Sequence, residues 1–483
     1  MISNFKFPIL IAVAVFWQLQ AAGQDTPDIL VTGKTKHEQV VISYGADTLK
    51  PAPVTSTSVG KHWWSIFGYE RLNELVLLAL EQNHQLAAGQ SQVKESEARL
   101  DLSRSALYPT VRINPSLNRE ELSANRPLPF DVPAEKVRYN TYTLPVELMY
   151  EVDIFGKNSS ETTAGRLRLK SSEALQEASE LDVAAAVARN FILLLMLDSE
   201  AEVFSRTREV RKENLDIVTT RYDAGLTNEM DMQRARTELS SVDVQLKNIQ
   251  IERREAELQL AALSGQPADN FEVKSDGIRF LVPQMKPVSP QMLALNRPDL
   301  QAGKFAVEAY KHQLKNARRN RYPSLFVFGS AGLVSAKTDN LFENDSRNWL
   351  VGANLSIPVF EGRRRQALLD ISEYQLENYA EQLKQNEVVA SREVAGALAE
   401  LRRLDEQLLH QQEFLEAAFR TADLSRQRYQ KGLVTYLEVV DADRIVLEAE
   451  RLLVQLLGRQ LLGTVNLATA LGGEAEQVYR ITN

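Results

Sequence analysis

Long stretches of the chain repeat small and apolar residues at alternating spacings of four and three positions. Residues 157–222 contain no proline and carry one such series. Its members are Leu167, Ser171, Ala174, Ala178, Leu181, Ala185, Ala188, Ile192 and Leu195. Residues 235–263 and 390–408 repeat the pattern with Arg253 as one polar break, and residues 440–468 place an apolar side chain at every seventh position. This heptad spacing predicts coiled-coil helices, and ~65 helical residues would form a rod of ~100 Å.

Four shorter segments between these helices alternate with a period of two. They cover residues 111–118, 138–152, 324–333 and 349–359, and the first and last alternate most cleanly. A period of two predicts β-strands with one apolar face, and the lengths suit tilted membrane strands of ~9 to 11 residues. A soluble antiparallel sheet with one wet face is the alternative. Because four strands cannot close a barrel and open edges are excluded from hydrocarbon, a membrane role would require several copies to pool their strands.

The two halves of the chain resemble each other. Arg221–Asp231, with the sequence RYDAGLTNEMD, is echoed 207 positions later by Arg428–Glu438, RYQKGLVTYLE. Two further pairs match in the same order at offsets of 205 to 214: Tyr108-Pro109 with Tyr322-Pro323, and residues 152–156 with residues 357–362. The sequence therefore predicts an internal duplication, each half running helix, two strands, very long helix, turn, long helix.

The N-terminus has the layout of a secretory signal peptide. Lys6 is followed by an apolar run, Phe7–Trp17, and by small residues up to Gly23. A single membrane anchor is the alternative, but the run is too short to cross ~30 Å of hydrocarbon as a helix. The expected organisation follows as ranges: 1–23 signal peptide, 24–69 extended arm, 70–265 first repeat, 266–290 linker, 291–473 second repeat and 474–483 tail.

Composition argues against nucleic-acid binding and against enzymatic chemistry. Lys and Arg number 56 against 64 Asp and Glu, so the net charge of −8 leaves no excess to neutralise phosphates. The absence of cysteine excludes disulfides, thiol chemistry and a lipid on an N-terminal Cys. The five histidines are scattered, and no HExxH, GxSxG or P-loop string is present. We expect no catalytic residue, cofactor or metal.

The two turn segments, RYDAGLTNEMD and RYQKGLVTYLEVVDADR, resemble those of the outer membrane factor family of TolC-like channels. The resemblance covers essentially the whole chain after the signal peptide. It implies a mainly α fold with a small β part, in which long antiparallel coiled-coil helices form a periplasmic tunnel. It also implies four transmembrane strands per protomer of a homotrimeric 12-stranded barrel.

The same resemblance implies an outer-membrane exit duct of a tripartite efflux system, which passively conducts small molecules. Its partners would be outer-membrane lipid, a periplasmic adaptor and an inner-membrane pump, with the second turn favouring the resistance-nodulation-division type. A type I secretion channel and a secreted coiled-coil scaffold or adaptor without a barrel are the alternatives.

The resemblance also assigns residues to a gate. Glu438 and Asp441 match acidic rings that narrow the periplasmic end of the tunnel, and such rings favour cations. Tyr429 and Asp231 match two of three residues that hold this end closed. The third, an Arg in the family, is Val434 here.

Local structure offers a second interpretation of the turns. Gly225 and Gly432 suit the left-handed residue that ends a helix, and Asn228 suits an N-cap. Thr435 with Glu438 has the spacing of a capping box. In the first turn Asn228 and Asp231 have the same spacing, so Asp231 is the counterpart of Glu438. Asp441 lies beyond the first helical turn and has no capping role. Both turns would form the exposed end of the tunnel, where an adaptor is expected to dock.

Overall fold

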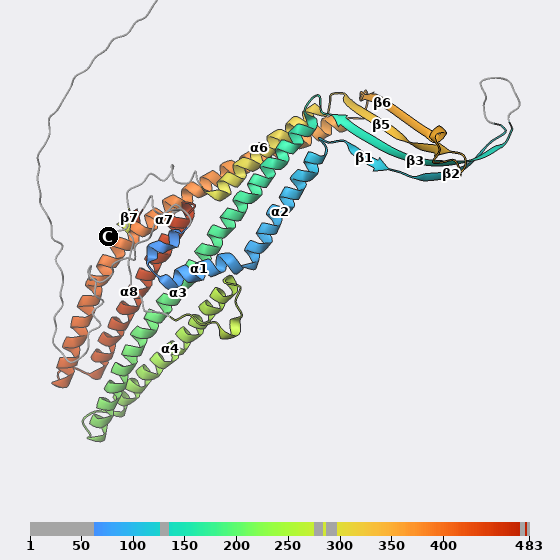
Figure 1. Ribbon diagram of the computed structural model, residues 1–483. Coiled ribbons are helices and arrows are strands. Elements are labelled where there is room, and N and C mark those ends of the chain that lie inside the picture. Colours follow the sequence, from blue (N-terminus) through green and yellow to red (C-terminus); the bar gives the residue numbers. More distant parts are fainter. Residues whose placement is uncertain (1–61, 126–134, 275–283, 286–296, 474–478, 481–483) are drawn as a thin grey trace, which may run out of the picture. The chain divides into compact units, whose positions relative to one another are not determined.

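The computed structural model describes residues 62–125, 135–274, 284–285, 297–473 and 479–480 (Figure 1). The predicted signal peptide and most of the predicted N-terminal arm, linker and tail lie outside the described residues. All elements below belong to one unit, Pro53–Asn483. The expected mainly helical fold with a small antiparallel sheet is confirmed.

Two helical hairpins dominate the structure. The long helices α3, Lys157–Asp223, and α7, Arg364–Gln430, have 67 residues each. Each is followed through a short turn by a helix of 35 residues, α4, Glu229–Leu263, or α8, Tyr436–Ala470. The helices of each hairpin pack together, and α3 also packs against α8 (Figure 1). A helix of 67 residues is ~100 Å long, so the predicted rods are confirmed.

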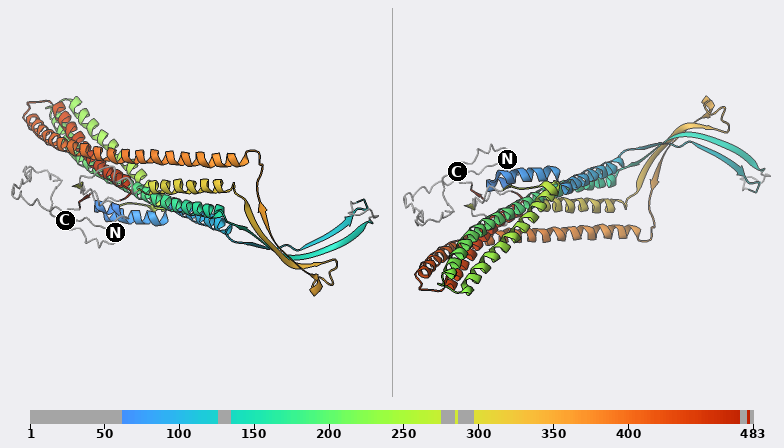
Figure 2. Two further views of the ribbon diagram at one scale, coloured as in Figure 1. Left: turned by 90° about the horizontal axis from the view of Figure 1, so that it is seen from above. Right: turned by 90° about the horizontal axis from the view of Figure 1, so that it is seen from below.

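Three shorter helices in the described part of the chain pack beside α3 and α7. These are α1, Glu70–Gln82, α2, His84–Ser105, and α6, Pro298–Arg319. Both views of Figure 2 show α6 between α3 and α7, and it packs against both. Among the described residues there are also three short 3₁₀ segments: Trp63–Phe67, Ala268–Asn270 and Asn344–Ser346.

The heptad positions form the core. Ala185, Ala188 and Ile192 of α3 are completely buried, and so is Val394 of α7. Small side chains allow close helix approach: Gly458 of α8 lies so near Met196 of α3 that there is no room for a Cβ atom. The spacing in the sequence therefore placed the buried stripe of each long helix correctly.

The antiparallel sheet follows the order β1–β3–β5–β6, with β2 also paired to β3. Its strands are β1, Thr110–Ile113, β2, Ser116–Leu122, β3, Val137–Val152, β5, Ser324–Ser335, and β6, Arg347–Ser356. A separate pair joins β4, Gln284–Met285, to β7, Tyr479–Arg480. Within the described residues, β6 on one side and β1 with β2 on the other have no further strand beyond them.

Two predicted strands need correction. The first is interrupted at residues 114–115 and forms β1 and β2, because Pro115 has no N–H for the ladder. The last ends at Ser356, and Ile357 and Val359 lie outside it, since Pro358 again removes a donor. β3 and β5 extend slightly beyond the predicted ranges.

The sheet has one apolar and one polar face. Val146 of β3 lies opposite Ile113 and Ala331, so these side chains share the apolar face. Glu147 lies opposite Arg112 and Ser330 on the other face. The apolar face is exposed in the single chain, and its largest exposed members on β6 are Trp349 at 76%, Val351 at 70% and Leu355 at 56%. An exposed apolar face of this kind indicates a surface for lipid or protein.

No helix among the described residues combines the length and apolarity needed to cross a bilayer.

Candidate functional site

The two hairpin turns end their long helices in the same way. Gly225 and Gly432 have φ of 73° and 71°, in the left-handed region that glycine enters without strain. The N–H of Leu226 donates to the carbonyl of Arg221 at 2.8 Å, and the N–H of Leu433 donates to that of Arg428 at 2.9 Å. Both turns are thus Schellman motifs, and the C-cap interpretation of the two glycines is confirmed.

Helix α4 begins with the expected side-chain cap. The Oδ1 of Asn228 accepts the N–H of Asp231 at 3.0 Å. The carboxylate of Asp231 accepts the hydroxyl of Thr227 at 2.8 Å and lies 3.5 Å from Arg234. Asp231 is therefore held within its own turn and its side chain is only 14% exposed.

The capping box expected at α8 does not form. Thr435 is the N-cap residue, but its hydroxyl accepts no capping hydrogen bond. Instead the backbone carbonyl of Thr435 accepts the N–H of Glu438 at 3.2 Å. The carboxylate of Glu438 makes no reciprocal bond and is exposed, so the spacing of a capping box was misleading here.

Glu438 and Asp441 lie three residues apart on α8 and both are exposed. Asp441 is 58% exposed, and its Oδ1 lies 3.9 Å from the guanidinium of Arg444. Neither carboxylate is used by the packing of the hairpin. Glu438 is exposed to solvent, and Asp441 is exposed beside Arg444 of the same helix.

Tyr429 contacts an arginine that was not among the predicted gate residues. The guanidinium carbon of Arg221, near the end of α3, lies 4.9 Å from the ring centroid of Tyr429. The Tyr429 hydroxyl is buried without a hydrogen-bond partner, so no bond joins it to Asp231. Burial raises the pKa of Tyr429, the charge of Arg221 opposes the rise, and that of Asp231 adds to it. A cation from the other hairpin thus lies against the ring of Tyr429.

A buried charge cluster joins all four hairpin helices behind this contact. Arg211 of α3 is 1% exposed, with its Nη2 3.4 Å from Glu238 of α4 and its Nη1 3.7 Å from Asp443 of α8. Arg426 of α7 donates to Asp443 at 2.7 Å, and Arg444 donates to Glu238. Three cations share two buried carboxylates. Removing Arg211 would leave each of the two buried carboxylates with a single cation and less compensation for its burial, which is costly.

Tyr436 lies beside this cluster. Its ring centroid is 5.6 Å from that of Tyr429, and it packs with Val218 and Ala235 of the other hairpin. Burial raises the pKa of Tyr436 to about 12, opposed by Arg211 and reinforced by Asp443. The hairpin ends are therefore held by apolar packing around buried charges.

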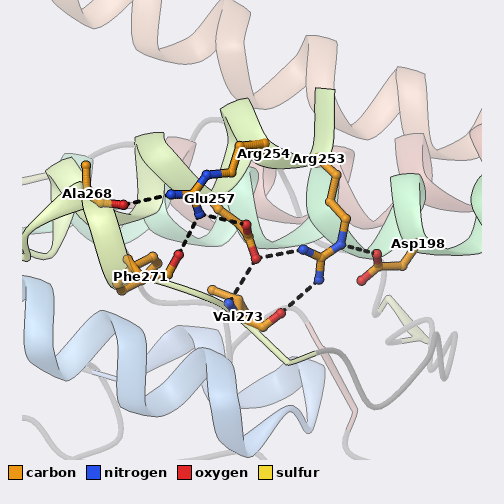
Figure 3. Close-up of polar contacts among 7 residues, drawn as sticks. All are labelled: Asp198, Arg253, Arg254, Glu257, Ala268, Phe271 and Val273. Carbon is orange, nitrogen blue, oxygen red and sulfur yellow. Dashed lines mark hydrogen bonds and ion pairs between the residues drawn. The ribbon is translucent and has the colours of Figure 1, made fainter. Parts of the chain in front are cut away.

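A second polar cluster fixes the chain where it leaves the first hairpin (Figure 3). Arg253, the polar break in the heptad pattern, donates to Asp198 and Glu257 at 2.6 Å each and to the carbonyl of Val273 at 2.9 Å. Arg254 donates to the carbonyl of Phe271 at 2.8 Å. Glu257 also accepts the N–H of Val273 at 3.0 Å. These bonds tie residues 268–273 to α4.

The buried charges had a signal in the sequence that was not used. Arg211 lies seven residues from both Phe204 and Val218, which are buried, so it continues a heptad position. Glu238 and Asp443 each follow a buried seam residue by three positions. A charge on the apolar stripe of a helix indicates a buried ion pair, but it does not name the partner.

The described residues contain no convergent group of three or more histidine or acidic side chains that would hold a metal ion. The side chains at the hairpin ends serve in packing, in helix capping and as surface charges.

The fold, the paired hairpins and the amphipathic sheet define a class of outer-membrane channel proteins. The sequence pattern of the outer membrane efflux protein family matches residues 75–266 and 289–473. The chain belongs to this family, which is one of channels and not of enzymes.

The chain aligns with individual relatives over most of their length. The chain is 27% identical over 417 residues to the pyoverdine export outer membrane protein OpmQ of Pseudomonas aeruginosa, covering 86% of this chain and 87% of that protein. It is 25% identical over 421 residues to the cation efflux system protein CusC of Escherichia coli, covering 86% and 88%.

Solved structures show the same fold. The outer-membrane channel OprN superimposes with a TM-score of 0.80 at 22% identity, covering 86% of this chain and 93% of that one. VceC of Vibrio cholerae gives a TM-score of 0.78 at 23% identity, covering 86% and 99%.

Proposed function

We propose that this protein is the outer-membrane exit duct of a tripartite efflux system, passively conducting small molecules that an inner-membrane pump and a periplasmic adaptor deliver. The observation that carries the proposal is one chain joining an amphipathic sheet to helices of ~100 Å. The apolar face of the sheet suits lipid, and the helices suit a tunnel through the periplasm. OpmQ, named for pyoverdine export, and CusC, named for cation efflux, support export as the general activity.

The unpaired edges of the sheet require more than one protomer in the membrane. An unpaired edge is not tolerated in hydrocarbon, so β6 of one protomer would pair with β1 and β2 of the next. β1 and β2 pair with successive parts of the same strand, β3, and would act as one strand. Each chain would then contribute four strands: β1 with β2, β3, β5 and β6. A homotrimer would then close a barrel of 12 strands.

An internal duplication underlies this design. The helices of 67 residues recur in the two hairpins, as do those of 35 residues, and the family pattern matches the chain in two stretches. The division into repeats 70–265 and 291–473, joined by the linker 266–290, follows from that correspondence. Each half contributes two strand positions to the barrel and one coiled-coil hairpin to the tunnel.

The hairpin ends form the gate. In the trimer, Glu438 and Asp441 would each contribute three carboxylates to rings that narrow the pore and attract cations. Tyr429 and Asp231 are the gate-contact residues, with Arg221 in place of the family's arginine. Closing would bring like charges together, so the buried packing behind them has to hold the closed form.

The same turns would receive the adaptor. Leu226 and Leu433 follow the turn glycines and are 69% and 65% exposed, although the leucine of a Schellman motif usually packs on its own helix. Exposed leucines at both ends offer apolar contacts to an adaptor. The pump would be of the resistance-nodulation-division type.

Planar-bilayer conductance of the purified mature protein tests the duct. We expect stable small openings and a heat-modifiable trimer band from an outer-membrane fraction. Recovery as a soluble periplasmic protein that never inserts would instead support a coiled-coil scaffold.

Two lysine substitutions test the orientation of the sheet. Val351→Lys places a charge on the apolar face, where it costs about 2 to 4 kcal/mol at mid-bilayer, and is expected to reduce trimer insertion. Ser330→Lys is the matched control on the polar face and is expected to insert normally. Equal insertion of both variants would contradict a lipid-facing role for the apolar face.

A further inference from the structure

The boundary between helices and sheet is strongly basic in the second half of the chain only. Residues 315–322 hold four basic and no acidic residues, and residues 358–366 hold three basic and one acidic, a net charge of +6. The matching windows of the first half, 101–108 and 153–161, hold two basic and three acidic residues, a net charge of −1. Helix capping and strand pairing are common to both halves, so they do not account for the difference.

The basic segments meet at the end of α6 and the start of α7. Arg365 donates from Nη1 to the carbonyl of Asn320 at 2.7 Å, and Arg321 donates from Nη2 to Gln366 at 3.3 Å. Arg319 donates to the carbonyl of Gly156 at 2.8 Å, which joins both segments to the start of α3. The cations are thus gathered in one place by tertiary contacts.

Two of these cations have no partner. Arg363 and Arg364 are exposed, and within the described residues their guanidinium groups make no hydrogen bond or ion pair. The neighbouring carboxylate, Glu361, is taken by Arg365 at 2.5 Å. Arg363 also has φ of 67°, a value that favours glycine, and is the one such non-glycine residue in the described ranges. Among the described residues, their guanidinium groups are therefore not used to hold the fold, although their backbones bond at the start of α7.

The same surface exposes large apolar side chains. Val359 is 93% exposed and Phe360 is 90% exposed, directly after the strand that carries the apolar face of the sheet. Residues 358–361 and 363–366 line a pocket of about 100 Å³ between these side chains and the arginines. The rings of Phe155 and Tyr322 stack with their centroids 4.8 Å apart. Apolar groups beside free cations are typical of the level of a bilayer where acyl chains meet headgroups.

We propose that Arg321, Arg363 and Arg364, with Val359 and Phe360, form an arginine patch that binds the phosphate groups of anionic phospholipids. Val359 and Phe360 would enter the acyl region, while the guanidinium groups would bind phosphates in the leaflet on the helix side of the barrel. The inference rests on the proposed function, because it requires the sheet to lie in the outer membrane.

The lipids retained by the full-length protein test the patch. The protein is reconstituted into an equimolar mixture of phosphatidylglycerol and phosphatidylethanolamine, repurified, and its bound lipids are measured by native mass spectrometry. We expect wild type to enrich phosphatidylglycerol about fivefold or more, and Arg363→Gln with Arg364→Gln to lose most of that enrichment. The matched control is Arg402→Gln with Arg403→Gln, the same charge change roughly 60 Å along α7, and it is expected to behave as wild type.

Conductance of each preparation separates the possible failures. Equal lipid ratios in wild type and in the Arg363 and Arg364 variant, with normal channels, would overturn the patch and leave the duct intact. Failure of wild type to insert at all would overturn the duct and the patch together. In a mixture that also contains lipid A, enrichment of lipid A without phosphatidylglycerol would overturn the assignment to phospholipid.

Discussion

The guanidinium of Arg221 lies over the ring of Tyr429, with 4.9 Å between the guanidinium carbon and the ring centroid, and so connects the end of α3 to the end of α7. The contact uses the face of the ring and leaves the hydroxyl without a partner. The two hairpins are therefore joined near their turns by a cation over an aromatic ring.

Tyr429→Phe is expected to change the free energy of unfolding by no more than about 0.5 kcal/mol and to leave the resting conductance unchanged. The reason is that the lost hydroxyl makes no hydrogen bond. Arg221→Gln removes the cation and is expected to increase the resting conductance. Chemical unfolding and single-channel recording check both. A Tyr429→Phe channel that opens at rest would show that the hydroxyl, and not the ring, holds the gate.

Arg211→Met is expected to lower the free energy of unfolding by about 3 to 5 kcal/mol, because Glu238 and Asp443 would stay buried with less compensation. Arg71→Met is the control, since Arg71 pairs with Glu74 on the surface and its loss should change little. Thermal dissociation of the trimer measures both variants. Equal melting temperatures would contradict a structural role for the buried cluster.

Glu438→Gln with Asp441→Asn is expected to lower the cation preference of the channel several-fold and to enlarge its openings, since both acidic rings lose their charge. The reversal potential in a salt gradient measures the change. Glu74→Gln, a neutralisation on α1, serves as control. An unchanged reversal potential in the double variant would exclude these carboxylates from the pore.

Glu450→Gln is expected to raise the melting temperature at pH 8 and to have little effect at pH 4. Burial raises the pKa of Glu450 above its ordinary value of 4.5, while Arg206 opposes the rise. The stability contributed by protonated Glu450 is complete below the ordinary pKa and is lost as pH rises through the raised one. Glu448→Gln, an exposed change on the same helix, should show no such dependence, and parallel pH profiles for the two variants would refute the prediction.

Glu257→Gln should show the opposite pH dependence. Burial favours the neutral acid, but hydrogen bonds from Val273, Arg253 and Arg254 outweigh it and lower the pKa of Glu257. Its stabilisation is present above the ordinary value of 4.5 and is lost as pH falls through the lowered pKa. We expect the variant to lose about 2 kcal/mol at pH 7, and less at pH 3.

Chymotryptic cleavage at Phe271 provides a second readout for Glu257→Gln, because the carboxylate holds residues 268–273 against α4. We expect faster cleavage in the variant at pH 7. Glu255→Gln, on the exposed side of the same helix, is the control. Equal cleavage rates in the two variants would show that Glu257 does not restrain this segment.

The periodicity of the sequence by itself determined the long helices and, apart from the breaks at Pro115 and Pro358, the strand positions. A heptad spacing or a period of two reflects which face of a local element is buried, so it can be read without knowing what covers that face. Gly225 and Gly432 were predictable for the same reason, because a left-handed residue is a local requirement of the helix end.

Only the tertiary structure decided which side chains meet. Arg211, Glu238 and Asp443 come from three helices, and no spacing in the sequence indicates which charge pairs with which across them. Arg221 contacts Tyr429 because the end of α3 lies close to it, which residue order does not reveal. The capping box at Thr435 failed because the carbonyl, and not the hydroxyl, faces the N–H of Glu438. Patterns along one helix specify a buried face, but contacts between helices depend on how the chain brings distant segments together.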